Sequence, residues 1–162
     1  NLFSPLGIEV PRDLVVRDEA EHLALMKDRN ARGWVVDPEG LNWASWGLFL
    51  KAEDMAKIGE LYLRDGMWGK DRIVSSSWVA ESTREQSRCT QWGNLAYGYL
   101  WWLVDGDSFA ALGDGGNAIY VNRADGTVIA IASTFMREAR DRIELIKNHI
   151  EPAISGFPRI PC

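Results

Sequence analysis

The chain has few of the residues that most often bind metals or act as bases: among its 162 residues are 2 cysteines and 2 histidines. Cys89 and Cys162 lie far apart, and neither a C-x-x-C nor an H-x-x-x-H pattern is present. His22 lies in a charged segment and His149 lies beside an apolar helical stripe, so we interpret both as structural residues rather than members of a Ser/His/Asp triad. We therefore expect no metal site and no cofactor.

A block of basic residues and a long apolar run are also missing. The 18 lysines and arginines are outnumbered by 23 aspartates and glutamates, which gives a formal net charge of −5. Because nucleic-acid binding depends on neutralising backbone phosphates, this balance argues against DNA or RNA as a partner. No apolar segment approaches the roughly 20 residues that cross a bilayer, so no membrane span is expected. With 46% hydrophobic and 25% charged residues, the composition is typical of a globular domain.

A serine nucleophile activated by lysine is absent as well. That arrangement needs the pattern S-x-x-K, which places both side chains on one turn of a helix. The residues three positions before the lysines are Ala24, Leu48, Asp54, Met67 and Glu144. Residues 120–122 (Tyr-Val-Asn) match the Y-x-N pattern of a second catalytic base, but the match is short and we interpret the segment as a strand. We therefore predict no catalytic residue on this chain.

Apolar residues at helical spacing, together with end signals, predict several helices. The predicted helices cover residues 19–27, 52–64, 75–82 and 139–150. Glu53 and Asp54 mark the start of the second helix, because the helix dipole favours anions there, and Gly66 can cap its end. Pro152 is expected to end the last helix.

Aromatic and β-branched residues in the last part of the chain predict about three antiparallel strands. The segments concerned are residues 97–104, 109–112, 118–122 and 128–133. An Asp-Gly turn before the last segment predicts a hairpin, and the continuous apolar run in that segment predicts cover on both faces. A final helix packed on this sheet gives an α+β fold. We expect residues 1–95 to form part of a helical region with connecting loops, and residues 96–162 to form the strands and final helix of the sheet region.

Glycines gather in residues 113–116 (Gly-Asp-Gly-Gly), between two predicted strands. The segment is not a dinucleotide-binding fingerprint, because a strand rather than a helix follows it. Glycines at this place permit unusual backbone angles and close approach of a ligand to main-chain N–H groups, as an oxyanion hole requires. A plain glycine-rich turn or bulge explains the same residues, and both interpretations stay open.

Tryptophan is frequent, with 8 residues. Each tryptophan brings a large apolar area and one hydrogen-bond donor, so we expect most of them in the core and a minority lining an apolar substrate pocket. Trp101 and Trp102 are neighbours in a predicted strand, and they should therefore point to opposite faces.

Several segments follow one another in an order that is typical of one enzyme family. Residues 2–8 (LFSPLGI) are similar to F-x-P-L-G-M, and residues 46–48 and 53–59 (WGL, EDMAKIG) are similar to G-G-L-x-S-T-x-x-D-M-A-K-F-G. Residues 97–102 (YGYLWW) are similar to Y-G-Y-G-W-W, and residues 109–117 stand where that family has its K-T-G or H-x-G strand. In this order the chain resembles the C-terminal half of the serine β-lactamase-like hydrolases, which include class C β-lactamases and penicillin-binding proteins.

The resemblance implies a β-lactamase/transpeptidase-like fold and a role for the glycine segment. In that family the strand supplies a backbone N–H that holds, together with the nucleophile's own N–H, the developing oxyanion of an acyl-transfer intermediate. Here Gly113 ends the strand and the donor is expected at Asp114, or at Gly115 if the frame slips by one. Ala111 stands where the family has a Lys or His that positions an anionic substrate. This difference favours the esterase and 6-aminohexanoate-dimer hydrolase branches, and the negative charge of Asp114 also argues against anionic substrates.

The resemblance also implies that the S-x-x-K serine and the catalytic tyrosine lie upstream of this chain. We therefore expect the chain to be the C-terminal portion of a serine hydrolase that acts on small-molecule esters or amides through an acyl-enzyme, and to be inactive alone. A half-sheet exposes an edge and an apolar face, so we expect an intimate partner: the N-terminal half of the same protein, as a separate chain or a swapped copy. The alternative is a non-catalytic binding or assembly module in which the glycine segment is only a turn.

Overall fold

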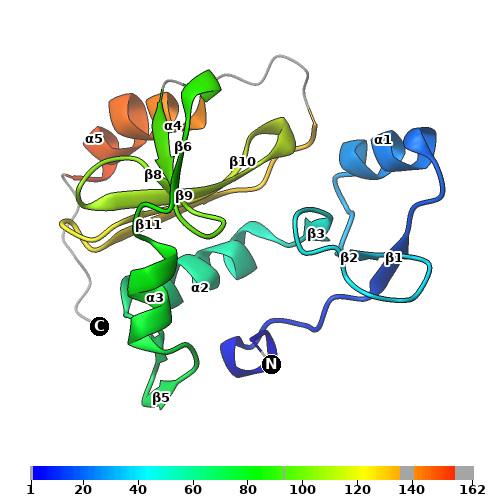
Figure 1. The fold of residues 1–162 in the computed structure, drawn as a ribbon, viewed down its shortest axis with the longest axis horizontal. Helices are drawn as coiled ribbons and strands as arrows, with labels where there is room; N and C mark the ends of the chain where they lie inside the picture. Colours follow the sequence, from blue (N-terminus) through cyan, green and yellow to red (C-terminus); the bar gives the residue numbers. More distant parts are fainter. Residues whose placement is uncertain (1, 93, 136–140, 156–162) are drawn as a thin grey trace.

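The computed structural model describes residues 2–92, 94–135 and 141–155 (Figure 1). The helical elements are η1 Ser4–Leu6, α1 Glu19–Lys27, α2 Ala52–Leu63, α3 Ser76–Ser82, η2 Thr90–Trp92, η3 Asp114–Gly116, α4 Arg142–Leu145, η4 Ile146–Ile150 and α5 Glu151–Ile154. The strands are β1 Asp13–Val15, β2 Gly33–Val36, β3 Leu48–Phe49, β4 Met67–Trp68, β5 Asp71–Arg72, β6 Ser87–Cys89, β7 Leu95–Tyr97, β8 Trp102–Leu103, β9 Ser108–Gly113, β10 Asn117–Asn122 and β11 Thr127–Ile131. The fold is α+β, as predicted. No helix of the described ranges is long and apolar enough to cross a membrane.

Three of the predicted helices, α1, α2 and α3, form within one residue of their predicted bounds. α1 begins after Asp18, whose side chain accepts a backbone hydrogen bond of 2.8 Å from the first turn. α3 begins after Ser75, whose hydroxyl accepts a hydrogen bond of 3.1 Å from the backbone N–H of Trp78. After α2 the chain passes through Gly66 at φ +84°, a conformation that favours glycine. The ends of these helices are therefore determined by residues next to them in the sequence.

The main sheet has six strands in the order β11-β10-β9-β8-β7-β6, and each strand is antiparallel to its neighbours. β10 and β11 form the predicted hairpin, in which Asn122 pairs with Thr127 and Gly126 turns at φ +63°. Two smaller sheets, β1-β2-β3 and β4-β5, lie outside this main sheet.

Helices cover both faces of the main sheet (Figure 1). On one face α2 packs against β10 and β11, over a buried cluster that includes Trp101, Phe109 and Val121. On the other face Tyr120 packs against Ile146 of the final helix, the name used here for α4, η4 and α5 together (residues 142–154). Because alternate strand residues point to opposite faces, each strand contributes to both layers. β11 contributes apolar side chains to both clusters, as its continuous apolar sequence predicted.

At one end of the main sheet the strands are shorter and more numerous than predicted. Residues 97–104 do not form one strand, because the chain turns after β7 through Gly98 and Leu100, where Leu100 has φ +64°. A Cβ at Gly98 would collide with the backbone oxygen of Ser82, so this turn is built around a glycine. The sheet therefore has six strands rather than about three. Strands as short as β6, β7 and β8 are too brief for an alternating pattern to reveal them.

Pro152 does not end the final helix, contrary to expectation. It lies within α5, which continues to Ile154. In the preceding η4, a π-helical turn, the Glu151 N–H donates to the Ile146 carbonyl five residues earlier. This wider turn accommodates a residue that lacks an N–H and whose ring needs space. Ala139, the expected first residue of the helix, lies outside the described residues.

An ionic and hydrogen-bonded network seats the final helix on the sheet. The Tyr120 hydroxyl and Asn122 Nδ2 donate to Glu151 Oε1 at 2.9 and 2.8 Å. Lys147 Nζ lies 2.8 Å from Asp105 Oδ2 and 3.4 Å from Glu151 Oε2. Burial acts to raise the pKa of Glu151, but the hydrogen bonds from Asn122 and Tyr120 lower it below its usual value. Burial likewise acts to raise the pKa of Asp105, but hydrogen bonds, with Lys147 as the main partner, lower this pKa to about 2. Both carboxylates are therefore ionised at neutral pH.

Candidate functional site

The glycine segment forms a tight turn between β9 and β10. Gly113 ends β9 with extended backbone angles (φ −118°, ψ 162°), and the next three residues form η3. Gly115 and Gly116 have φ values of +75° and +93°, which residues with side chains rarely adopt. Gly113 and Asp114 are exposed to solvent. The structure thus places the three residues of the expected oxyanion site, Gly113, Asp114 and Gly115, in one turn at the end of a central strand.

The register of the sheet determines which way the backbone groups at this turn point. β8 pairs with β9 as far as Ala110, and beyond that residue no strand of the described ranges pairs with the edge of β9 that faces away from β10. The Val104 N–H donates to the Ser108 carbonyl at 2.9 Å, so Ser108 and every second residue after it direct their backbone groups toward this edge. Because the backbone of Gly113 is extended, the alternating direction of the backbone N–H and C=O groups continues to Asp114. The Asp114 N–H therefore points toward the open edge, and no acceptor for it lies among the described residues.

Two side chains hold the turn from its other side. Asn117 Nδ2 donates to the Asp114 carbonyl at 2.8 Å, while Asn117 Oδ1 accepts a hydrogen bond of 2.8 Å from the Ser133 N–H. Arg142 Nε, at the start of the final helix, donates to the Gly116 carbonyl at 3.0 Å. The turn is thus tied both to the segment after β11 and to the final helix.

Arg142 is a residue that sequence reasoning missed. Ala111 replaces the cation of the family's strand, and no other cation was predicted at the turn; Ala111 packs with the apolar cluster under α2. The Arg142 guanidinium reaches the turn instead, so closely that a Cβ added at Gly116 would collide with it. No sequence pattern signals this contact, because the two residues are 26 positions apart and meet through the seating of the final helix.

The Y-x-N segment lies away from the turn, inside the sheet. Tyr120 is 0% exposed, and its hydroxyl donates to Glu151 of the final helix. Burial is the main cause that raises the pKa of Tyr120. A fully buried hydroxyl with a carboxylate partner does not contact a substrate, and the interpretation of these residues as a strand is confirmed.

The two histidines lie on different helices. The ring of His22 in α1 contacts Trp46, with centroids 4.6 Å apart, and His149 is exposed on the final helix. In the part of the chain that the structure describes, no group of three or more His, Cys, Asp or Glu side chains could hold a metal ion.

The expectation that most tryptophans lie in the core is wrong. Trp101 is buried, but Trp43 and Trp78 are 44% and 46% exposed. Trp43 lies beside Trp46 with ring centroids 5.7 Å apart, and Trp78 stacks on Tyr99 at 5.5 Å with parallel ring planes. The exposed rings therefore gather into two aromatic surfaces, one beside α1 and one on α3.

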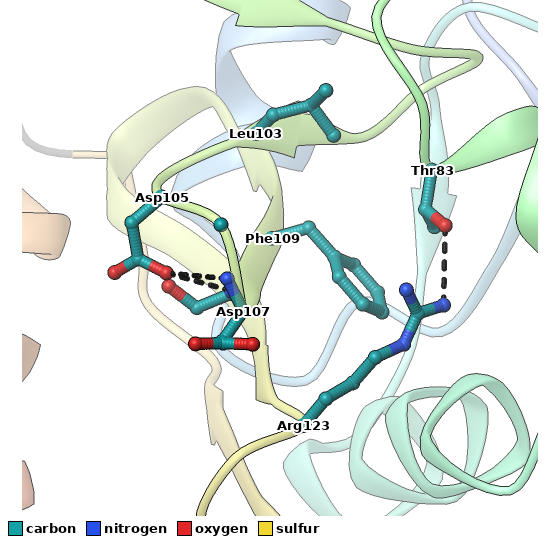
Figure 2. Close-up of a pocket in the computed structure, with 8 residues that line it drawn as sticks. Thr83, Leu103, Asp105, Asp107, Phe109 and Arg123 are labelled. Atoms are coloured by element: carbon teal, nitrogen blue, oxygen red, sulfur yellow. Dashed lines mark hydrogen bonds between the residues drawn. The ribbon is translucent and has the colours of Figure 1, made fainter.

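Two pockets lie at the other end of β9, away from the glycine turn. The first has a volume of about 210 Å³ and lies between Leu103, Phe109 and Arg123 (Figure 2). Arg123 Nη2 donates to Thr83 Oγ1 at 3.1 Å, and its guanidinium carbon lies 4.8 Å from the centre of the Phe109 ring. The second pocket, of about 390 Å³, lies over β6, β7 and β8. Neither of these two pockets includes a residue of the glycine turn.

No family model and no curated protein matches the chain, whereas solved structures do. The chain aligns over 75% of its length with 32% of a Bacillus anthracis protein provisionally assigned as a 6-aminohexanoate-dimer hydrolase, at a TM-score of 0.60 and 24% identity. A family VIII carboxylesterase aligns with 60% of this chain and 30% of its own, at a TM-score of 0.47 and 19% identity. A penicillin-binding protein homologue from Caulobacter crescentus aligns with 82% of this chain and 44% of its own, at a TM-score of 0.48 and 14% identity.

The chain therefore spans about a third of the length of the first of these structures. At this level of identity the likeness concerns the fold, and the alignment covers most of the chain described above. The likeness to this first structure shows that the chain contains part of a β-lactamase/transpeptidase-like fold, as the order of its motifs predicted.

Proposed function

We propose that the chain is the C-terminal portion of a serine hydrolase, in which it supplies one donor of an oxyanion hole. The observation that carries this proposal is the Asp114 N–H, which lies in an exposed turn and points toward the open edge of β9. A fixed donor without a competing acceptor stabilises the charge that develops on a carbonyl oxygen during acyl transfer. The glycines beside it allow a substrate to approach the backbone closely.

The reaction that fits this donor is the cleavage of an ester or amide through an acyl-enzyme. A serine oxygen from the upstream part of the fold bonds to the carbonyl carbon, and the alcohol or amine leaves with a proton. Water then cleaves the acyl-serine bond, which releases the carboxylic acid and restores the serine hydroxyl. This chain contributes the donor and part of the pocket walls, and it is inactive without the upstream serine.

The surroundings of the turn favour a small, uncharged substrate with an apolar group. The exposed carboxylate of Asp114 lies on the residue that carries the donor, and it repels anionic substrates. Phe135 packs against Gly115, and its N–H donates to a backbone oxygen of α1 at 3.1 Å. On the same helix, His22 contacts Trp46, so the aromatic surface beside α1 lies near the turn. Aromatic rings of this kind bind apolar acyl or leaving groups.

The N-terminal half of the same protein, as a separate chain or a swapped copy, is the proposed partner. β11 forms one edge of the main sheet in the described ranges, and its sequence carries neither a charge nor a proline that would protect an edge. We propose that strands of the N-terminal half pair along β11. The partner also brings the S-x-x-K serine to the open edge of β9.

Hydrolysis of p-nitrophenyl esters tests this function. The chain is assayed alone and after co-expression with the segment encoded immediately upstream. Nitrophenol release is expected from the combination and not from the chain alone, and replacing the serine of the upstream S-x-x-K by alanine should abolish it. Absence of hydrolysis from both preparations would remove the proposal.

The second candidate function is a non-catalytic binding or assembly module. The stacked, half-exposed rings of Trp78 and Tyr99 favour it, because such a surface fits an apolar partner. A stable complex with the upstream segment that hydrolyses no ester, together with weaker assembly of Trp78→Ala, would support this candidate over the first.

A further inference from the structure

We infer that Asn117 and Arg142 are positioning residues that hold the candidate oxyanion donor in place, an inference that rests on the proposed function. The side chains of both residues donate to carbonyl groups of the turn. Each residue thereby fixes a peptide group that follows the Asp114 N–H.

Asn117 sets the orientation of the peptide that joins Asp114 to Gly115. Its Nδ2 donates to the Asp114 carbonyl at 2.8 Å. Because a trans peptide is planar, fixing this carbonyl also fixes the Gly115 N–H, which points the opposite way. The other end of the same amide accepts the Ser133 N–H at 2.8 Å. One side chain therefore ties the turn to the segment after β11, and both ends of its amide are used.

Arg142 holds the peptide that joins Gly116 to Asn117, two peptides further along the turn. Its Nε donates to the Gly116 carbonyl at 3.0 Å, and its guanidinium packs against the glycine where a Cβ would otherwise lie. Gly113, on the other side of the donor, is held by its pairing with Asn117 in the sheet. Peptides on both sides of the Asp114 N–H are therefore fixed, which leaves this donor little freedom to turn away.

A fixed donor matters more for catalysis than for folding. The pairing of β9 with β10 joins Gly113 to Asn117 on the two sides of the turn, so the sheet itself holds the turn closed. An oxyanion donor, in contrast, must be oriented before the charge develops, because reorientation during the reaction costs activation energy. We therefore expect both residues to affect kcat more strongly than KM.

A pair of asparagines on the same strand gives a matched experiment. Asn117→Ala removes the bridge at the turn, whereas Asn122→Ala removes a side chain with the same chemistry at the far end of β10, where it donates to Glu151. Ester hydrolysis by the chain combined with its upstream segment is measured for both variants and for Arg142→Gln and Arg142→Lys. Amide hydrogen exchange at Gly115 and Gly116 is measured in the same proteins.

The expected result is a fall in kcat of roughly ten- to a hundredfold for Asn117→Ala, with KM little changed, because small misplacements of a catalytic group have effects of this size. Arg142→Gln should show a fall in the same direction, and Arg142→Lys should retain part of the rate. The turn amides should exchange faster in Asn117→Ala but not in Asn122→Ala. Equal losses of kcat in the two asparagine variants, or unchanged kcat and exchange in Asn117→Ala, would overturn the inference.

The two readouts keep this inference separate from the proposed function. If the unmodified combination hydrolyses no ester, the proposed function fails, and the exchange of the turn amides then decides whether Asn117 holds the turn. If the combination is active and Asn117→Ala retains full kcat, the function stands and the inference fails.

Discussion

Replacing Asp114 by proline removes the proposed oxyanion donor with little other change. Proline lacks an N–H, and its ring fixes φ near the value of the first residue of a helical turn, which is the place of Asp114 in η3. The preceding residue, Gly113, already has the extended angles that precede a proline (φ −118°, ψ 162°). The Asp114 N–H has no acceptor among the described residues, so no hydrogen bond of this part of the chain is lost.

The expected effects follow from this geometry. The free energy of unfolding of Asp114→Pro should stay within about 0.5 kcal/mol of the unmodified chain, as for surface substitutions that break no contact. The kcat of ester hydrolysis by the combined protein should fall by roughly 100- to 1000-fold, the usual loss when one oxyanion donor is removed. Denaturant unfolding and p-nitrophenyl ester kinetics measure the two quantities.

Asp114→Ala is the control, because it keeps the N–H and removes the carboxylate. Its kcat should stay close to that of the unmodified protein. If Asp114→Pro keeps its activity while remaining folded, the donor is not at Asp114. Equal losses in both variants would show that the carboxylate, and not the backbone N–H, is the group that matters.

Three further predictions concern stability. Glu151→Ala removes the acceptor of the buried Tyr120 hydroxyl and one of the two acceptors of Asn122 Nδ2, and should lower the free energy of unfolding by about 2–4 kcal/mol. Glu144→Ala, at an exposed site of the same helix, should change it by less than about 0.5 kcal/mol in denaturant titrations, and similar values for both variants would contradict the network. The pKa of Asp105 is lowered from 3.8 to about 2, so the stability that this carboxylate contributes is present above pH 4 and is lost as the pH falls toward 2. Asp105→Asn should therefore weaken the dependence of the free energy of unfolding on pH between about pH 4 and pH 2. An unchanged pH dependence in this variant would refute the contribution of Asp105. Gly66→Ala should lower the melting temperature, because Gly66 has φ +84° and an added Cβ would collide with the Val74 carbonyl; an unchanged melting temperature would show that this turn relaxes freely.

Local signals allowed most of the helical structure to be predicted from sequence. Asp18 and Ser75 cap helices within their own first turns, and Gly66 follows a helix in the left-handed conformation, so these boundaries depend on neighbouring residues alone. Pro152 misled the prediction, because its effect depends on a π-helical turn that no local pattern indicates. The strands at the far end of the sheet were missed in part because they are two or three residues long.

The sequence indicated the glycines of the candidate site but not the side chains that hold the turn. Gly113, Asp114 and Gly115 were proposed as site residues because a glycine cluster between strands is visible in the sequence and matches the place of a known motif, and this assignment stays a prediction. Arg142 could not be found in this way, because it reaches the turn from a helix 26 positions away. Such contacts depend on how the final helix sits on the sheet, which is decided by tertiary packing rather than by any one segment.

Intact-mass analysis of the combined protein during turnover of an activated ester tests the central claim most directly. The account predicts that the mass of one acyl group is added to the upstream polypeptide, at the serine of its S-x-x-K motif, and that this chain keeps its unmodified mass. An acyl group found on this chain, or ester hydrolysis by this chain alone, would contradict the account.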